Sequence, residues 1–145
     1  MSVAYVEVVE NEVEKDESSE GVRGGVEKLV IEYLHKEFPL GREHNIRIYE
    51  NGRIEYALKS PFRVDDHIKK ELNVEPEEVV SYADELLNLG FLFLTKNYGW
   101  PSSIGSGDYF ITLNYKDVRK TVRFKGLFPN RGYWEFIHKL EELVR

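Results

Sequence analysis

The strongest constraint on the fold is segment 46–58, Ile-Arg-Ile-Tyr-Glu-Asn-Gly-Arg-Ile-Glu-Tyr-Ala-Leu, which alternates on both sides of Asn51-Gly52. Alternation of apolar and polar residues places every second side chain on one face of a β-strand. Asn-Gly is typical of a type I′ turn, because both central residues of that turn have a positive φ. The segment therefore predicts a β-hairpin in which each strand has one buried face.

A second hairpin and two helices are predicted further along the chain. Segments 109–115 and 118–124 are two β-prone runs separated by a short turn. A helix is predicted to begin at Pro76, which suits a first helical position, and to end at Gly90, which suits a C-terminal cap. The last helix is predicted over 133–144, with Trp134, Ile137, Leu140 and Val144 on one side.

Three shorter segments are also assigned from their spacing and caps. Residues 26–38 match both helical and strand spacing; helical spacing has more matches, and Pro39 supplies a stop, so a helix is favoured over a strand. Asp65 can cap a short helix over 66–72. Phe-Leu-Phe-Leu, residues 91–94, is predicted to be a short buried strand.

These elements together predict an α+β fold. An antiparallel sheet of about four to six strands, built from the two hairpins, would have its helices packed on one face. Residues 1–25 are predicted to be a short strand followed by an acidic flexible linker, and residues 26–145 a single domain. One domain is also what a chain of 145 residues predicts.

Composition excludes several classes of protein. The chain has no cysteine, so disulfides, thiolate zinc sites and cysteine nucleophiles are all excluded. No apolar run is long enough to span a membrane, and the N-terminus does not read as a secretory signal. A cytoplasmic protein is expected.

Two resemblances concern origin and shape. Glutamine is absent, methionine occurs once and glutamate occurs 20 times, so the composition resembles that of conserved hypothetical proteins of heat-loving archaea. From Ile46 onward the order of a strand, a turn with Gly, a returning strand with Tyr, a helix, a hairpin and a helix resembles an uncharacterised bacterial domain family. That family usually has a Cys-Pro pair before the first strand, which this chain lacks. The resemblance implies a shape and no activity.

No constellation of residues predicts a reaction. The four histidines show neither HxH nor HExxH spacing, and Asp65-Asp66-His67 is explained by helix capping. Glu135 and His138 form a single ExxH, where a di-iron bundle needs two. There is no GxSxG elbow. We therefore predict no catalytic residue, no metal and no cofactor, although scattered residues leave an enzyme open.

The glycine-rich segment 96–108 is the first place where a function is expected. It lacks the GxxxxGK[ST] pattern and leads into a strand, so it does not predict a phosphate-binding loop. Its length leaves a lid, a partner contact or a plain connection. As a partner contact it would present three residues, Trp100, Tyr98 and Ile104.

The second place is a basic region late in the chain. Residues 1–20 contain seven acidic residues and one basic residue, whereas residues 96–131 contain two acidic and seven basic residues. Alternation along 118–125 places several cations on one sheet face, and two more lie near the strand ends, so the candidate polyanion-binding residues are Lys116, Arg119, Arg123, Lys125 and Arg131. Solvation, or screening by the acidic 10–20 segment, is the alternative explanation.

Two functions follow from these features. The first is a small non-catalytic module that binds another protein, as a monomer or a small homo-oligomer. The second is a binder of RNA or another polyanion, which the net charge of −6 disfavours.

Overall fold

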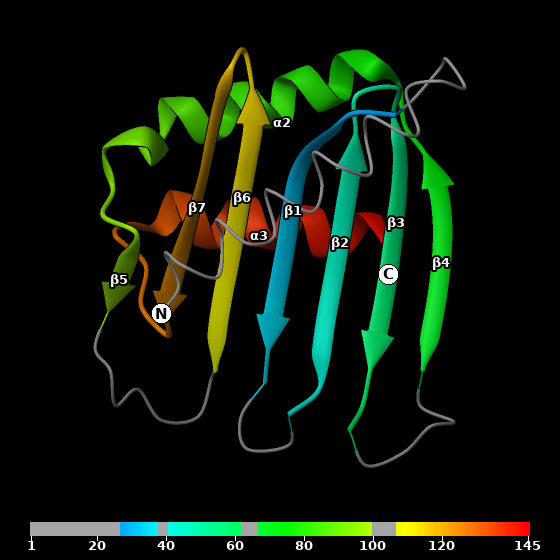
Figure 1. Ribbon diagram of the computed structural model, residues 1–145, viewed down its shortest axis with the longest axis horizontal. Helices are drawn as coiled ribbons and strands as arrows, with labels where there is room; N and C mark the ends of the chain where they lie inside the picture. The colour runs from blue at the N-terminus through cyan, green and yellow to red at the C-terminus, as the bar shows by residue number, and fades with distance from the viewer. Residues whose placement is uncertain (1–26, 38–40, 62–66, 100–106) are drawn as a thin grey trace.

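A computed structural model of the chain describes residues 27–37, 41–61, 67–99 and 107–145. These residues form a seven-stranded mixed sheet and two α-helices, which confirms the α+β class (Figure 1). The strand and linker predicted for residues 1–25 lie outside the described residues, as does the predicted cap Asp65.

The sheet is larger than predicted, and it is not purely antiparallel. Its strand order is β4-β3-β2-β1-β6-β7-β5. All neighbours pair antiparallel except β5 and β7, which are parallel. The prediction of four to six antiparallel strands is therefore wrong in number and in part of the pairing. The strands are β1 (Leu29–Lys36), β2 (Glu43–Tyr49), β3 (Arg53–Lys59), β4 (Ile68–Asn73), β5 (Asn97–Gly99), β6 (Asp108–Tyr115) and β7 (Val118–Lys125).

Both α-helices lie behind the sheet in the view of Figure 1 and cross its strands. Helix α2 spans Pro76–Asn88 and α3 spans Arg131–Leu143, so both predicted helices are confirmed. Pro76 occupies the first turn of α2, and the Asn130 side chain caps α3 by accepting a hydrogen bond from the backbone N–H of Gly132 at 2.8 Å. Within the described residues, neither helix has the length and apolar character needed to cross a membrane.

Both predicted hairpins are present, but the first has a different turn. The backbone N–H of Gly52 bonds to the carbonyl of Tyr49 at 2.9 Å, and Gly52 has a φ of 97°. Asn51 is not among the described residues with positive φ, so a type I′ turn at Asn51-Gly52 is wrong. Two consecutive residues with positive φ, as a type I′ turn requires, occur instead in the second hairpin, at Lys116 (52°) and Asp117 (64°). A β-carbon on Gly52 would lie 2.0 Å from the carbonyl oxygen of Val74, which explains the glycine.

Three short predictions are corrected by the structure. The helix favoured for 26–38 is wrong over 29–36, because these residues form strand β1 and pair with β2 on one side and β6 on the other. The short helix predicted for 66–72 is wrong over 68–72, because these residues belong to strand β4, which pairs with β3 along its whole length. The buried strand predicted for 91–94 is a 3₁₀ turn, η3 (Phe91–Phe93).

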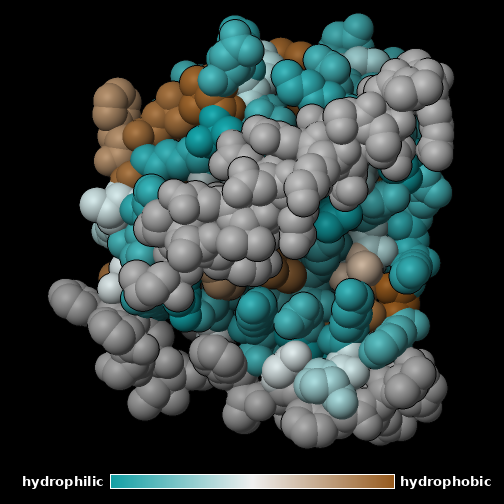
Figure 2. Space-filling view, in the orientation of Figure 1, coloured by the Kyte–Doolittle hydropathy of each residue, from teal (hydrophilic) through white to brown (hydrophobic). Residues whose placement is uncertain are grey.

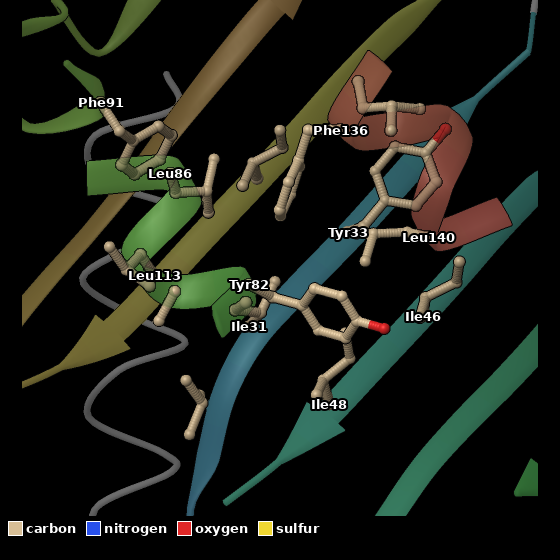
Figure 3. Close-up of a cluster of buried hydrophobic side chains, with 14 of the residues drawn as sticks. Ile31, Tyr33, Ile46, Ile48, Tyr82, Leu86, Phe91, Leu113, Phe136 and Leu140 are labelled. Carbon is tan, nitrogen blue, oxygen red and sulfur yellow. The ribbon is translucent and has the colours of Figure 1, made fainter. Parts of the chain in front are cut away.

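The core lies between the sheet and the two helices (Figure 3). Strand side chains such as Ile31, Tyr33 and Ile48 are fully buried there. Three of the four residues predicted to share one apolar side of the last helix, Ile137, Leu140 and Val144, are buried in the core, but the fourth, Trp134, is 43% exposed. Tyr133 and Phe136 are buried in the core in addition. The helix residues labelled in Figure 3 that pack on the strands are Tyr82, Leu86, Phe136 and Leu140.

The opposite face of the sheet, called here the open face, has a different character. Where Figure 2 leaves it visible, this face is mostly hydrophilic. Alternation explains why: Ile46 and Ile48 of β2 point into the core, so Arg47 between them points outward. No described helix lies on this face (Figure 1). Hydrophobic colour gathers at the upper left of Figure 2, where Figure 1 places the end of α2 and the segment leading to β5.

Candidate functional site

The open face has a wide groove over β1 to β4, with a volume of about 650 Å³. Its walls are charged with both signs, and many of the charges are paired. Arg47 bonds to Glu32 at 3.1 Å, and Glu71 is held by Arg53 at 2.7 Å. Since the cations and carboxylates of these pairs neutralise each other across the strands, the groove does not present one net charge to a ligand.

The predicted partner-contact residues are only partly described. Trp100 and Ile104 lie outside the described residues. Tyr98 is half-buried on β5, and its ring lies 6.4 Å from that of Phe124. Strand β5 forms one edge of the sheet, because it pairs only with β7 among the described strands.

Just before β5, the turn η3 carries an exposed aromatic residue that the sequence analysis missed. Phe93 is 91% exposed, the largest fraction among the exposed large hydrophobic residues of the described part. Its neighbour Phe91 is fully buried, so the turn is anchored on one side and open on the other. Phe93 was missed because a buried strand was predicted for 91–94. The run Phe-Leu-Phe-Leu does not indicate which phenylalanine is exposed.

The backbone around Phe93 is fixed by contacts on both sides. Gly90 enters the turn with a φ of 85°, which a residue with a β-carbon rarely adopts. The ammonium of Lys120 donates to the carbonyl oxygen of Leu92 at 2.8 Å and also to that of Leu94. Burial, together with the nearby charge of Lys96, lowers the pKa of Lys120. Lys120 therefore holds η3 in place instead of contributing to a basic surface.

Only three of the five residues in the predicted basic patch lie on the same face of the sheet. On β7 the core residues Val122 and Phe124 alternate with Arg119, Arg123 and Lys125, which therefore share the open face. The other two predicted residues lie elsewhere. Lys116 is exposed in the β6–β7 turn, and Arg131 begins α3, the helix on the opposite side of the sheet.

The charges of this patch also have partners. Arg123 donates to Asp108 through Nε at 3.0 Å and again through Nη2, and its guanidinium lies 5.6 Å from the ring centre of Phe110. Arg131 pairs with Glu135 at 3.1 Å. A cation that is already bound to a carboxylate offers less to a phosphate.

A cluster that the sequence analysis did not find lies where β1 ends and β2 begins. His35 and His44 are paired residues in the β1–β2 register, and their ring centres are 5.7 Å apart. Glu37 follows β1 directly, and its carboxylate lies 2.6 Å from Nε2 of His44. His44 also contacts the hydroxyl of Tyr56 through Nδ1 at 3.1 Å. His35 stacks on Tyr109 with ring centres 4.0 Å apart.

The backbone of Glu37 is held by two hydrogen bonds. The backbone N–H of Glu37 bonds to the carbonyl of Arg42 at 2.8 Å, and Gly41 returns a bond to the Glu37 carbonyl at 2.9 Å. Gly107 packs so closely that a β-carbon there would lie 2.0 Å from the carbonyl oxygen of Lys36. Gly107 belongs to the glycine-rich segment, so close backbone approach beside the cluster explains this glycine.

The charge state of the cluster follows from its contacts. Burial acts to raise the pKa of the Glu37 carboxyl, but hydrogen bonds from Arg42 and His44 outweigh it and lower the pKa. Burial raises the pKa of Tyr56, and the carboxylate of Glu141 adds to this effect. Glu37 is therefore an anion at neutral pH, and Tyr56 is a neutral hydroxyl.

Comparison with known proteins gives no functional assignment. Neither the models of protein families nor the curated proteins searched contain a match to this chain. What the described residues define is an α+β protein with a seven-stranded mixed sheet covered by helices on one face.

Proposed function

We propose that this protein is a small non-catalytic interaction module that binds another protein at the η3–β5 edge. This name denotes η3 together with strand β5, and its central residues are Phe93 and Tyr98. The observation that carries the proposal is the exposure of Phe93, a large aromatic side chain held 91% exposed on an anchored turn. Aromatic residues, Phe included, are enriched in the cores of protein–protein interfaces, and hot-spot residues fill well-packed pockets on the partner.

The energetics favour Phe93 as the anchor residue. Burying a phenylalanine side chain contributes about 1.5–3 kcal/mol. The turn that carries it is already ordered by Phe91 and Lys120, so little backbone entropy is lost on binding. A long flexible loop with the same side chain would lose more entropy and bind more weakly.

The edge strand adds a second means of contact. Strand β5 pairs with β7 on one side, and an extended segment of a partner can add to a sheet edge by backbone hydrogen bonds. With only three residues, β5 offers few such bonds. We therefore expect Phe93 to supply most of the affinity and β5 to fix the partner's direction.

The first experiment identifies the partner. A photo-crosslinking amino acid placed at position 93 is exposed to an extract of the source cells, and the same label at Val80 is the control. Val80 is 44% exposed on α2, outside the η3–β5 edge. A protein captured at position 93 but not at position 80 is then purified, and its affinity is measured.

The second experiment tests the anchor. In Phe93→Ala we expect the affinity for that protein to fall by at least about tenfold, with thermal stability unchanged because the side chain is exposed in the free protein. Val80→Ala should bind as the native chain does. If Phe93→Ala binds as tightly as the native chain, the interaction proposal for this edge is wrong.

Polyanion binding remains the alternative, and salt distinguishes it. Arg119, Arg123 and Lys125 share the open face of β7, so RNA affinity through them would fall steeply as salt rises. It would also weaken in Arg119→Ala and be indifferent to Phe93→Ala. Because Arg123 is paired with Asp108, we regard this function as the less supported one.

A further inference from the structure

We propose that His35, Glu37 and His44 bind one divalent first-row transition-metal ion. One ligand atom from each of these residues lies within 4.8 Å of the other two, and no other such group of three occurs among the described residues. Two ligands come from β1 and the residue that follows it, and one comes from β2. This inference is independent of the η3–β5 edge, which lies on another part of the sheet.

The types of ligand define the class of metal. Two imidazoles and one carboxylate suit Zn²⁺, Fe²⁺, Co²⁺ or Ni²⁺, whereas Ca²⁺ and Mg²⁺ prefer oxygen ligands alone. Three protein ligands leave at least one coordination position for water or a substrate, as in catalytic zinc sites. The site is therefore of the open kind rather than a closed structural one.

The distances require only small side-chain movements. With bonds of about 2.1 Å, a tetrahedral metal holds neighbouring ligand atoms about 3.4 Å apart. His44 Nε2 and Glu37 Oε2 are 2.6 Å apart, because they share a hydrogen bond that the ion would replace. Binding needs this pair to open by about 0.8 Å and the His35 ligand atom to approach it, which side-chain torsions can provide.

His44 has the hydrogen-bond surroundings of a metal-binding histidine, and His35 is oriented by ring stacking. A metal-bound imidazole usually donates its other N–H to a fixed polar partner. Nδ1 of His44 has such a partner in the hydroxyl oxygen of Tyr56, at 3.1 Å. The ring of His35 is held parallel to that of Tyr109, with an angle of 11° between the planes. Both rings are therefore oriented before an ion arrives.

Arg42 is the neighbour that opposes a cation. It donates to Glu37 Oε1 at 2.9 Å through Nε and contacts Oε2 at 3.3 Å. The ion would take Oε2, the oxygen nearer His44, while Arg42 keeps Oε1. If no metal binds, the same contacts are an Arg–Glu–His ion-pair network that closes the turn between β1 and β2. The experiment must separate these two roles.

The test uses the full chain without an affinity tag, stripped by a chelator and titrated with Zn²⁺ in a calorimeter and with Co²⁺ by absorption. We expect one ion per chain and ligand-field bands typical of nitrogen and oxygen ligands. His44→Ala should weaken Zn²⁺ binding by at least about 100-fold, and Tyr56→Phe by about 10- to 100-fold. His138→Ala, which removes a histidine of α3 outside the cluster, should leave binding unchanged.

Folding is checked separately, because His44 also has structural contacts. Glu37→Gln keeps the size of the side chain and removes a ligand charge, so it should lose the ion even if His44→Ala fails to fold. Circular dichroism of each variant confirms that the sheet is intact. The proposal is overturned if the folded native chain binds Zn²⁺ no more tightly than Glu37→Gln, or if His138→Ala causes the loss instead.

Discussion

Arg53 shows how single residues hold the outer strands of the sheet together. Its guanidinium donates to Glu27, to Glu55 at 2.6 Å and to Glu71 at 2.7 Å, and lies 4.5 Å from the ring centre of Tyr49. These carboxylates come from three different parts of the chain. One cation therefore links the segment just before β1 with β3 and β4, near the turn between β2 and β3.

This network makes stability dependent on acid. The hydrogen bond from Arg53 lowers the pKa of Glu27 below its usual 4.5. For Glu55, burial acts to raise the pKa, but the bonds from Arg53 and Tyr49 outweigh it and lower it. In both cases the unfolded chain binds protons more readily than the folded one. Their stabilisation is complete above about pH 4.5 and is lost as the pH falls through the folded values.

We therefore expect the free energy of unfolding of the native chain to fall as the pH drops below about 4.5. In Arg53→Met the acid-dependent loss should be smaller, and stability at neutral pH should fall by about 1–3 kcal/mol, because three carboxylates lose a charged donor. Urea denaturation across a pH series measures both effects. An acid-dependent loss of the same size in Arg53→Met and the native chain would contradict this account.

For the candidate sites, the sequence predicts which face of a strand a side chain is on, but not which distant residue it contacts. Alternation along β7 is sufficient to place Arg119 and Arg123 on one face, but it cannot indicate that Asp108 would pair with Arg123. The pair His35 and His44 depends on the register between β1 and β2. Once 26–38 is interpreted as a helix, no spacing in the sequence brings these two histidines together.

At the scale of elements, η3 depends on a side chain from another strand. Lys120 of β7 bonds to two carbonyls of the segment between α2 and β5. The hydroxyl of Tyr133 adds a bond to the Leu89 carbonyl at 2.9 Å, at the end of α2. The position of Phe93 is therefore fixed by β7 and α3 as well as by its own turn.

We expect Lys120→Met to destabilise the protein by about 1–3 kcal/mol, since the carbonyls lose a charged donor while the side chain keeps its length. Amides of η3 should exchange hydrogen faster, and affinity for a partner that binds Phe93 should fall although Phe93 is unchanged. Lys59→Met, at an exposed position at the end of β3, is the control. If both variants behave alike, Lys120 does not hold the turn.

Elements with strong local signals could be predicted, and those decided by pairing could not. Both hairpins and both long helices follow from turns, caps and periodicity in their own sequences. Segment 68–73, Ile-Lys-Lys-Glu-Leu-Asn, has good helix formers, yet β3 offers it an open edge and it pairs as β4. Segment 29–36 fits both periodicities, and its place between β2 and β6 decides the outcome.

At the scale of the whole molecule, the described sheet is organised around β1. It has hydrogen-bonded neighbours on both sides, and residues such as Ile31 and Tyr33 are fully buried. Strands β4 and β5 form the two edges. The charged sequence of β4 is typical of edge strands that avoid pairing with other molecules.

Native-state hydrogen exchange should be slowest in the central strand β1 and fastest in the edge strands β4 and β5. We expect amides of β1 to exchange about 100-fold or more slowly than those of β4 and β5, because opening β1 requires most of the sheet to unfold. Mass spectrometry of peptic fragments after timed exchange measures the difference. Equal protection of β1 and the edges in dilute solution would contradict the expectation.

The central position of β1 also has a consequence for synthesis on the ribosome. This strand is the first described element to be translated, but its partner β6 follows only after both hairpin strands of β2–β3, β4 and α2. Until β6 is made, the edge of β1 that will pair with it has backbone N–H and C=O groups without their final hydrogen-bond partners. Nascent chains of this protein should therefore need a chaperone or rapid elongation through Asp108–Tyr115 to avoid aggregation.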